Sequence, residues 1–257
     1  MNFNLILPKT TNRNKSELAF FDKLFSYKTF LIFSPHLDDA ALSMGSLLTD
    51  LARLNKDIKI VSLFTSGSSL YTSFNDRLLK QARVETAEEY FLARRDEDVK
   101  AIKEIGNMSV LHLGLVDAAW RANKDKKPFY PKKIIGNIHP EDDEVLSLIE
   151  QQINKLDYDR STTAIFSPLA RGRHVDHQIV RNAVTKIFPQ VIYYSDFPYV
   201  NQFENENAFI KDHNLSSIEW HGEYKKKKTA ILMYESQRVS LFQPKNLRLS
   251  HEVFYFH

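Results

Sequence analysis

The chain has 257 residues, the size of one large α/β domain or of two small ones. Hydrophobic residues make up 43% of it and charged residues 26%, as in an ordinary globular protein. The formal net charge of +3 is too small to indicate nucleic acid or a membrane surface as the main partner. Because the chain contains no cysteine, disulfides and thiolate ligands are excluded, and a metal ion would need histidine and carboxylate ligands.

The sequence indicates neither a signal peptide nor a transmembrane segment. Residues 1–8 include a few apolar side chains but no basic region before them, and polar residues 10–16 follow. No apolar run reaches the length of a transmembrane helix. We therefore expect a cytoplasmic protein, which also suits a chain without cysteine.

Short apolar runs alternate with stretches of helical periodicity along the chain. Residues 16–27 predict a helix, and residues 29–34 (TFLIFS) predict a strand buried on both faces. Residues 38–54 predict the next helix, and residues 58–65 (IKIVSLFT) the next strand. This strand–helix–strand order is typical of a parallel sheet.

The same alternation continues toward the C-terminus. The remaining expected elements are helices over 79–105, 141–156, 175–188 and 224–237, and strands over 110–115, 163–167, 191–195 and 251–257. Two long loops, 66–75 and 116–140, are of a length that is usually functional. We therefore predict an α/β fold, a Rossmann-like three-layer α/β/α sandwich with a mostly parallel sheet. Residues 1–257 are expected to form a single domain, with a core over about 28–200 and a C-terminal extension over about 201–257.

Candidate functional residues gather in two strand-to-helix turns, one after the 29–34 strand and one after the 163–167 strand. These turns contain His36, Asp38, Asp39, His174, Asp176 and His177. Either turn alone is also explained by acids that cap a helix. In open α/β sheets, however, ligands bind at the carboxyl ends of strands. Two such turns at the same edge of a sheet therefore predict one shared site.

These residue types suit a catalytic metal ion. A catalytic zinc ion takes three protein ligands and leaves one position for a water, whose pKa it lowers to about 7. His36 and Asp39 are three residues apart across a turn, so both can reach one ion, and a histidine of the second turn completes the set. Asp38 is then free to act as general base on the metal-bound water. The remaining histidine can stabilise the oxyanion or protonate the leaving amine, with Asp176 orienting His174.

The two turns resemble the signature segments of the PIG-L/LmbE-like family of N-acetylglucosaminyl deacetylases. The family's H-P-D-D-E stands here as HLDDA at 36–40, and its H-x-D-H stands as HVDH at 174–177. The resemblance implies a hydrolase that removes an N-acyl group, most often acetyl, from an amino sugar or glycoconjugate. It implies the following roles: metal ligands His36, Asp39 and His177; general base Asp38; and oxyanion-stabilising or general-acid residue His174, tuned by Asp176. The implied cofactor is Zn²⁺, and Fe²⁺ suits the same ligands.

Weaker similarity extends over most of the chain. The stretch 94–106 resembles the family's R-x-x-E helix, and Lys228 to Gln237 resembles its K…A-L…S-Q helix. The segment HLGLVD makes Asp117 a candidate contact to a sugar hydroxyl by the same resemblance. Two positions depart from the pattern, since Leu37 replaces a proline and Ala40 replaces a glutamate.

Further substrate contacts are expected from cationic side chains. Arg173 stands where the family often has glycine, and a cation there favours an anionic sugar, although pairing with local acids explains it equally well. Arg77, in the region after the second strand, is a candidate cover for a sugar ring. Residues 225–228, four lysines, are expected to form a solvated helix face, and His221 and His251 belong to no ligand-spaced pattern.

A metallohydrolase that acts on a non-sugar amide is one alternative, because the motifs indicate the reaction better than the substrate. Two other interpretations remain open. One is a non-haem iron oxygenase that uses His36, Asp38 and a distal histidine, although such enzymes are usually all-β. The other is a non-catalytic sugar-binding relic that lost its activity with Ala40. The expected partner is a small-molecule or glycoconjugate substrate and not nucleic acid.

Overall fold

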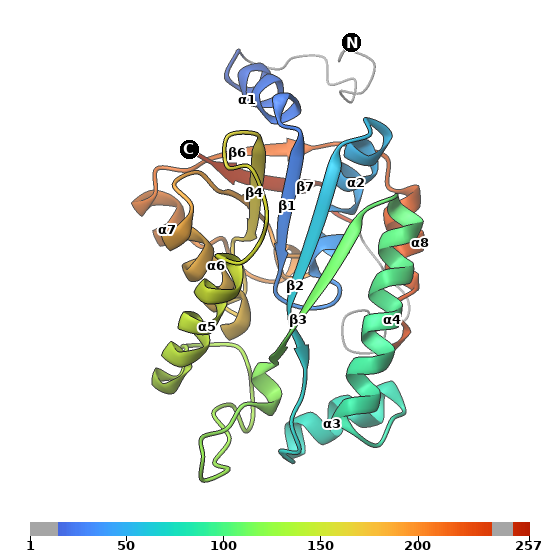
Figure 1. Ribbon diagram of the computed structural model, residues 1–257, viewed down its shortest axis with the longest axis vertical. Coiled ribbons are helices and arrows are strands. Elements are labelled where there is room, and N and C mark those ends of the chain that lie inside the picture. Colours follow the sequence, from blue (N-terminus) through green and yellow to red (C-terminus); the bar gives the residue numbers. More distant parts are fainter. Residues whose placement is uncertain (1–14, 238–248) are drawn as a thin grey trace.

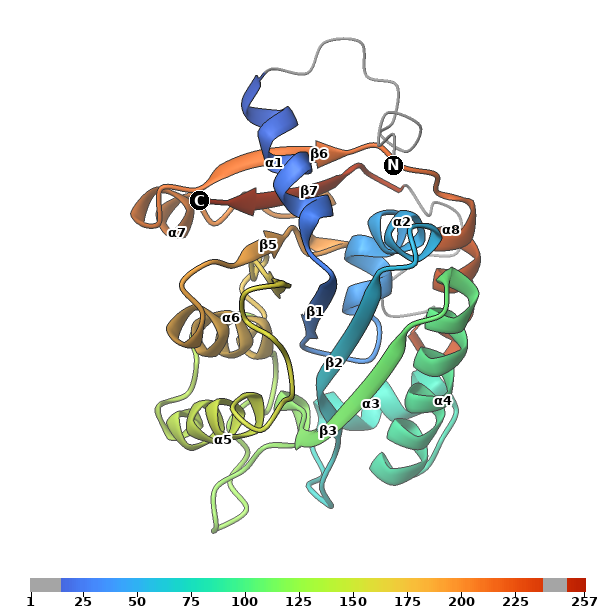
Figure 2. The ribbon, with the colours of Figure 1, turned by 45° about the horizontal axis from the view of Figure 1, so that its top comes forward.

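The computed structural model describes residues 15–237 and 249–257 of the chain. Its strands form one seven-stranded sheet in the order β3-β2-β1-β4-β5-β7-β6 (Figures 1 and 2). The strands are β1 (Thr29–Ser34), β2 (Asp57–Ser66), β3 (Ser109–Val116), β4 (Thr163–Pro168), β5 (Ile192–Tyr194), β6 (Ser216–Trp220) and β7 (Glu252–Phe256). The first five strands are parallel, and β7 pairs antiparallel with both β5 and β6. The predicted mostly parallel α/β fold is confirmed.

Helices cover both faces of the sheet (Figure 1). The α-helices are α1 (Lys15–Ser26), α2 (Asp39–Arg53), α3 (Ser73–Ala82), α4 (Ala87–Ile105), α5 (Asp143–Ile153), α6 (Val175–Ile187), α7 (Asn207–Asp212) and α8 (Lys225–Leu232). Helices α2, α4 and α8 contact one another on one side, and α5 and α6 contact each other on the opposite side. The result is three layers, as the alternating sequence pattern predicts.

Strand β1 lies in the middle of the sheet and is buried on both faces. Phe30 and Ile32 pack into the apolar cluster beneath α2, whereas Leu31 and Phe33 pack into the cluster beneath α6. Each of these side chains is at most 2% exposed. A strand between two helical layers needs apolar side chains at every position, which is why TFLIF is a continuous apolar run.

The expected helix over 79–105 is wrong, because the chain forms two helices there. Arg83 ends α3 in a left-handed conformation with φ of 60°. Thr86 then starts α4 with a capping box, in which its side chain accepts from the Glu89 N–H and the Glu89 carboxylate accepts from the Thr86 N–H. A second capping box between Thr72 and Asn75 starts α3 inside the segment expected to be a loop.

The C-terminal part of the chain extends the sheet. Strand β6 and helix α7 were not predicted, and they bring the residues after 200 beside the parallel core. The solvated face expected for residues 225–228 is wrong for Lys227, which is 1% exposed. Its Nζ donates to Glu252 Oε1 at 2.8 Å, and the Glu252 carboxylate accepts the N–H groups of Ser46 and Leu47.

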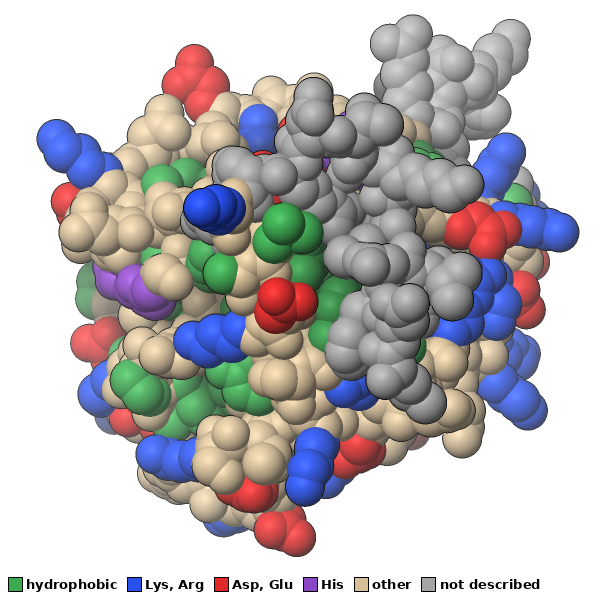
Figure 3. Space-filling model, turned by 90° about the horizontal axis from the view of Figure 1, so that it is seen from above, with side chains coloured by type: hydrophobic (Ala, Val, Ile, Leu, Met, Phe, Trp, Pro, Cys, Tyr) green, Lys and Arg blue, Asp and Glu red, His purple; other side chains and the backbone are tan. Residues whose placement is uncertain are grey.

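The surface seen from above mixes charges of both signs with apolar side chains (Figure 3). On the described part of this face the cationic side chains do not form the single-sign stripe that nucleic-acid binding requires. Within the described ranges, the helices are too short or too polar to cross a bilayer.

Candidate active site

The two predicted turns lie next to each other because their strands are neighbours. Strand β1 pairs in parallel with β4, so both chains leave the sheet at the same edge. After β1, the Ser34 hydroxyl donates to the His36 carbonyl and accepts the Ala40 N–H, which fixes the turn into α2. After β4, His174 caps α6 by accepting the Asp176 N–H at Nδ1.

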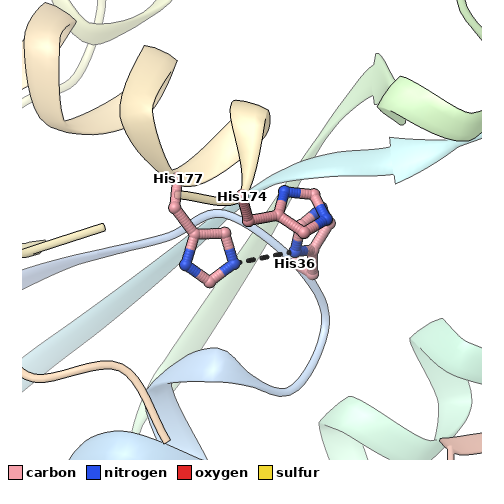
Figure 4. Close-up of side chains that lie close together, drawn as sticks. All are labelled: His36, His174 and His177. Atoms are coloured by element: carbon pink, nitrogen blue, oxygen red, sulfur yellow. Dashed lines mark hydrogen bonds between the residues drawn. The ribbon is translucent and has the colours of Figure 1, made fainter. Parts of the chain in front are cut away.

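Three potential ligand atoms form a nearly equilateral triangle between the turns. His36 Nδ1 lies 3.2 Å from Asp39 Oδ2. His177 Nε2 lies 3.3 Å from Asp39 Oδ2 and 3.3 Å from His36 Nδ1 (Figure 4). Ligand atoms about 2.0–2.1 Å from a tetrahedral zinc ion are about 3.3–3.4 Å apart. The triangle therefore has the dimensions that one bound ion requires.

Both histidines of the triangle have a carboxylate on their other nitrogen. His36 Nε2 lies 3.0 Å from Asp176 Oδ2, and His177 Nδ1 lies 2.6 Å from Asp196 Oδ1. Metal-binding histidines usually donate their second N–H to such a partner, which fixes the tautomer and directs the free nitrogen to the ion. This arrangement fits a divalent metal ion. Asp196 was not predicted, since it follows β5 with no motif around it.

The carboxylate of Asp176 does not take the position that the sequence predicts. It faces His36 and the Arg121 guanidinium, with Oδ1 2.6 Å from Arg121 Nη1. Only its backbone N–H contacts His174, at 3.2 Å from Nδ1. Its side chain therefore does not orient His174 through a hydrogen bond. Burial has the larger effect and lowers the pKa of His174, but the negative charge of Asp176 acts to raise it, as the alternative form of the prediction holds.

Other groupings of potential ligands are also present among the described residues. Within 4.8 Å of one another lie atoms of His36, His174 and His177, and likewise atoms of His36, Asp117 and Asp176. A separate group at the surface joins Glu219, His221 and His251 within the same limit. The pairing of β6 with β7 brings these last residues together, so the sequence-based view that His221 and His251 share no ligand pattern is wrong.

The buried carboxylates make the site attractive to cations. Burial alone would lower the pKa of His36, but hydrogen bonds to Asp176 and Asp39 raise it well above its usual value. Burial also opposes protonation of His177, yet Asp39 and Asp196 raise its pKa to about 9. With a pKa of about 9, His177 carries a proton in the metal-free chain at neutral pH, and its Nε2 pairs with His36 Nδ1 at 3.3 Å, so a divalent ion would displace at least one proton.

This electrostatic arrangement predicts that metal binding releases protons. A protonated imidazole must lose its proton to bind an ion, so the apparent affinity for zinc should rise with pH, by up to about tenfold per unit for each proton released. Titration calorimetry at pH 7 in two buffers of different ionisation enthalpy measures the release. Binding heats that do not depend on the buffer would contradict the prediction.

Asp38 lies beside the triangle without belonging to it. Its Oδ2 is 3.3 Å from Arg94 Nη2, and both side chains are 6% exposed. Burial raises the pKa of Asp38 to about 6, although Arg94 opposes this shift. A carboxylate with a pKa in this range suits a general base near neutral pH.

His174 lies beside both histidines of the triangle, with its ring centroid 4.7 Å from that of His36 and 4.9 Å from that of His177 (Figure 4). Burial, with the nearby His36 and His177, lowers its pKa well below the usual value. The ring is therefore neutral, and because Nδ1 accepts the Asp176 N–H, Nε2 carries the hydrogen. His174 thus offers one N–H donor.

The triangle opens into a cavity of about 180 Å³. Its lining includes His36, Asp38, Asp39, Leu42, Leu78, Tyr90, Arg94, Asp117, Ile134, His174, His177, Phe197, Pro198, Tyr199 and Gln237. Asp117 is present, as predicted. The predicted substrate residues Arg77 and Arg173 are not: Arg77 lies over the Phe74 ring on α3, and Arg173 donates to Asn137 at the surface.

Four polar residues of the lining were missed as candidates: Tyr90, Arg94, Tyr199 and Gln237. Arg94 and Gln237 belong to the stretches that resemble the family's R-x-x-E and S-Q segments, which was the available signal. Tyr199 meets His177 edge-on, with ring centroids 5.8 Å apart. Helix α4 and the segment after α8 therefore supply part of the wall.

Comparison with known proteins identifies the family. Residues 31–188 match the family model described as PIG-L, GlcNAc-PI de-N-acetylase. This segment is more than half of the chain. The chain belongs to the PIG-L family. The resemblance read from the two histidine turns is confirmed.

Two curated relatives of this PIG-L chain are named 2'-N-acetylparomamine deacetylase. The protein from Niallia circulans is 27% identical over 84% of this chain and 82% of its own length. The protein from Streptomyces fradiae is 28% identical over 67% of this chain and 58% of its own length.

Solved structures share the PIG-L fold. The zinc-inhibited form of teicoplanin deacetylase Orf2 superposes with a TM-score of 0.73 at 21% identity, covering 89% of this chain and 97% of that one. The 4-carboxy-2-hydroxymuconate hydratase GalB superposes with a TM-score of 0.52 at 16% identity, covering 89% of this chain and 95% of that one. Since a hydratase shares the fold, the reaction has to be argued from the side chains.

Proposed function

We propose that this PIG-L protein is a metal-dependent hydrolase that removes the N-acetyl group of an amino sugar. The observation that carries the proposal is the triangle of His36 Nδ1, Asp39 Oδ2 and His177 Nε2, with edges of 3.2–3.3 Å. The carboxylate of Asp38 lies beside this triangle and is not one of its corners. The deacetylases among its relatives support an N-acetyl sugar as substrate. A linear amide C–N bond is then the bond that breaks.

The proposed ligands are His36, Asp39 and His177, and zinc is the proposed metal. A divalent ion held there would act as a Lewis acid that polarises the acetyl carbonyl and lowers the pKa of a water to about 7. Two imidazoles and one carboxylate also suit Fe²⁺, so the ligand set is compatible with either ion.

Asp38 is the proposed general base. Its carboxylate reaches the cavity from the start of α2 and is held by Arg94. It accepts a proton from the attacking water and can pass that proton to the leaving amine. His174 has a different task, because a neutral ring with hydrogen on Nε2 donates a hydrogen bond and does not supply a proton. We assign it to the oxyanion of the tetrahedral intermediate.

The cavity suits one sugar ring. Its volume of about 180 Å³ is below the roughly 300–1,000 Å³ of sites for drug-sized ligands. Asp117 accepts a hydrogen bond from the Ala119 N–H through Oδ1, and its Oδ2 lies 3.5 Å from His36 Nε2. Asp117 and Arg94 are the proposed contacts to sugar hydroxyls, in place of Arg77 and Arg173.

The two alternative interpretations are not favoured. An oxygenase site would need Asp38 as ligand, but it is Asp39 that contacts both His36 and His177, whereas Asp38 pairs with Arg94. The fold is α/β and not the all-β fold usual for that class. A protein that had lost its activity with Ala40 would not be expected to keep all the catalytic groups. Here the triangle, the carboxylates of Asp176 and Asp196 behind its histidines, and the proposed base Asp38 are all present.

The base predicts an acid limb in the pH–rate profile. Asp38 works when deprotonated, so kcat/KM should fall about tenfold per pH unit below its pKa. Burial raises that pKa to about 6. A bound divalent ion lowers it by attraction, so the inflection is expected at pH 6 or below. The profile should be measured with saturating zinc at every pH, because loss of metal would imitate the limb. An inflection above pH 7 would exclude Asp38 as the base.

A substrate screen tests the proposed activity. Zinc-loaded protein should release acetate from N-acetylated amino sugars, and the screen should include free, phosphorylated, nucleotide-linked and aminoglycoside-linked forms. The matched blank is the chelated protein with the same substrates. Acetate release that the chelator does not reduce, or no release from any of these sugars, would contradict the proposal.

A further inference from the structure

The carboxylate of Asp176 is a fully buried junction behind the proposed metal ligands. Its exposed fraction is 0%, and it does not line the cavity. Oδ2 accepts the N–H of Ala118 at 3.0 Å and faces His36 Nε2 at 3.0 Å. Oδ1 faces Arg121 Nη1 at 2.6 Å. The carboxylate therefore contacts His36 at Nε2, while Nδ1 of the same ring faces Asp39 in the triangle.

Arg121 lies between two buried carboxylates. Its Nε is 2.9 Å from Asp142 Oδ1, its Nη2 donates to Asp142 Oδ2 at 3.0 Å, and its Nη1 reaches Asp176. The guanidinium is also flanked by the rings of Phe64 and Tyr130, at 5.1 and 5.6 Å. Nη1 also donates to the Val116 carbonyl at 3.1 Å, so hydrogen bonds to Val116 and Asp142 hold the planar guanidinium in place while it forms an ion pair with Asp176. A lysine ammonium has no such planar set of donors.

The contacts continue through Tyr130. Its hydroxyl donates to Asp142 Oδ2 at 2.5 Å and accepts the His139 N–H at 2.7 Å. Arg121, Tyr130 and Asp142, which we call the Arg121 clamp, thus join the two ends of the long loop at 116–140. The Tyr130 hydroxyl is thus engaged within this clamp.

We propose that Arg121 is a positioning residue of the metal site: through the Arg121 clamp it holds the Asp176 carboxylate against His36 Nε2 and so directs His36 Nδ1 to the ion. The inference rests on the proposed function, because it needs His36 as a ligand. Arg121 lies outside the cavity and in a different loop from every proposed ligand, yet it would raise the affinity of the site for the metal.

Substituting Arg121 tests this role. Arg121→Met should weaken zinc binding by about 10–100-fold, the usual cost of losing a partner behind a metal ligand. Arg121→Lys keeps the positive charge but loses the planar guanidinium, so its zinc affinity should lie between those of Arg121→Met and the wild type. At saturating zinc, kcat should drop while KM changes little, because Arg121 does not line the cavity. The dissociation constants come from competition with a chelator at 25 °C, on protein shown to be folded by circular dichroism.

The control removes a different buried ion pair. Glu252→Gln breaks the Lys227–Glu252 pair between α8 and β7, which contacts Ser46 and Leu47 and none of the proposed ligands. Zinc affinity should then stay at the wild-type value even if stability falls. If Arg121→Met does not fold, Asp142→Asn and Tyr130→Phe test the positioning role instead. Both variants are expected to bind zinc more weakly than the wild type.

The outcomes separate the two proposals. Wild-type affinity in folded Arg121→Met, or in both clamp variants when Arg121→Met does not fold, overturns the positioning role and leaves the hydrolase standing. Equal weakening in Glu252→Gln overturns it too, because the effect would then follow from any lost ion pair. A wild-type chain that binds no zinc overturns the proposed function, and this inference with it.

Discussion

Replacing Asp38 with asparagine should reduce kcat by about 10²–10⁴-fold while the metal stays bound, because a general base contributes a rate factor of this size. Asparagine has nearly the shape of aspartate and can still accept a hydrogen bond from Arg94, whose Nη2 lies 3.3 Å from Asp38 Oδ2. It cannot accept a proton from water. The expected result is therefore a folded, zinc-loaded protein that turns over slowly.

The matched control for this variant is Asp50→Asn. Asp50 is a buried aspartate on α2, 5% exposed, and its Oδ1 lies 3.2 Å from Arg53 Nη1. This pair does not line the cavity. Its loss should leave kcat close to the wild-type value. Both variants need steady-state rates together with zinc content by mass spectrometry. Normal turnover by Asp38→Asn would remove Asp38 from the mechanism, and loss of zinc would show that Asp38 acts as a ligand.

Replacing His177 with alanine should abolish metal binding and activity together. The variant loses the Nε2 corner of the triangle and leaves the Asp196 carboxylate buried without the imidazole that it contacts at 2.6 Å. Zinc content is expected to fall from about one ion per chain to nearly none, because a catalytic ion needs its three protein ligands.

His112→Ala provides the control for the His177 variant. His112 also contacts a buried aspartate, with Nε2 2.9 Å from Asp98 Oδ2, but it lies on β3 away from the triangle. This variant should keep its zinc and its rate. If His177→Ala retained one zinc ion per chain with unchanged affinity, His177 would not be a ligand.

The parallel core was predictable because burial on both faces leaves a plain sequence signal. The β1 segment TFLIFS is apolar at nearly every position, and the predicted and observed bounds agree. The break at Arg83 between α3 and α4 was missed, since apolar periodicity runs across it and only the Thr86 capping box marks the restart. The pairing of β6 with β7 depends on contacts between distant segments, which periodicity does not show.

The site was predictable where one short segment supplies several groups. The turn at 36–39 keeps its shape although Leu37 and Ala40 depart from the family pattern. Leu37 is fully buried in a cluster with Leu79 and Trp120, and the backbone N–H of His36 donates to Asp39 Oδ2 at 2.8 Å. The turn is thus held by Ser34, by Asp39 and by backbone groups, without a polar contribution from the side chains of Leu37 and Ala40.

Partners supplied by other elements were not predictable. Asp196 reaches the site from the end of β5 with no motif around it, and its role depends on packing between segments. Arg94 reaches it from α4, where the R-x-x-E resemblance was the available signal. Arg77 and Arg173 were chosen for their charge, and the structure places both outside the cavity lining. Residue type and proximity in sequence thus identified the candidate ligands better than the substrate contacts.

Anomalous diffraction from zinc-loaded crystals tests the central claim most directly. The account predicts one strong peak about 2.0–2.2 Å from His36 Nδ1, Asp39 Oδ2 and His177 Nε2, the distances of zinc to nitrogen and oxygen ligands. Data on both sides of the zinc absorption edge identify the element. Zinc bound only elsewhere, for example among Glu219, His221 and His251, with no peak within the triangle, would contradict it.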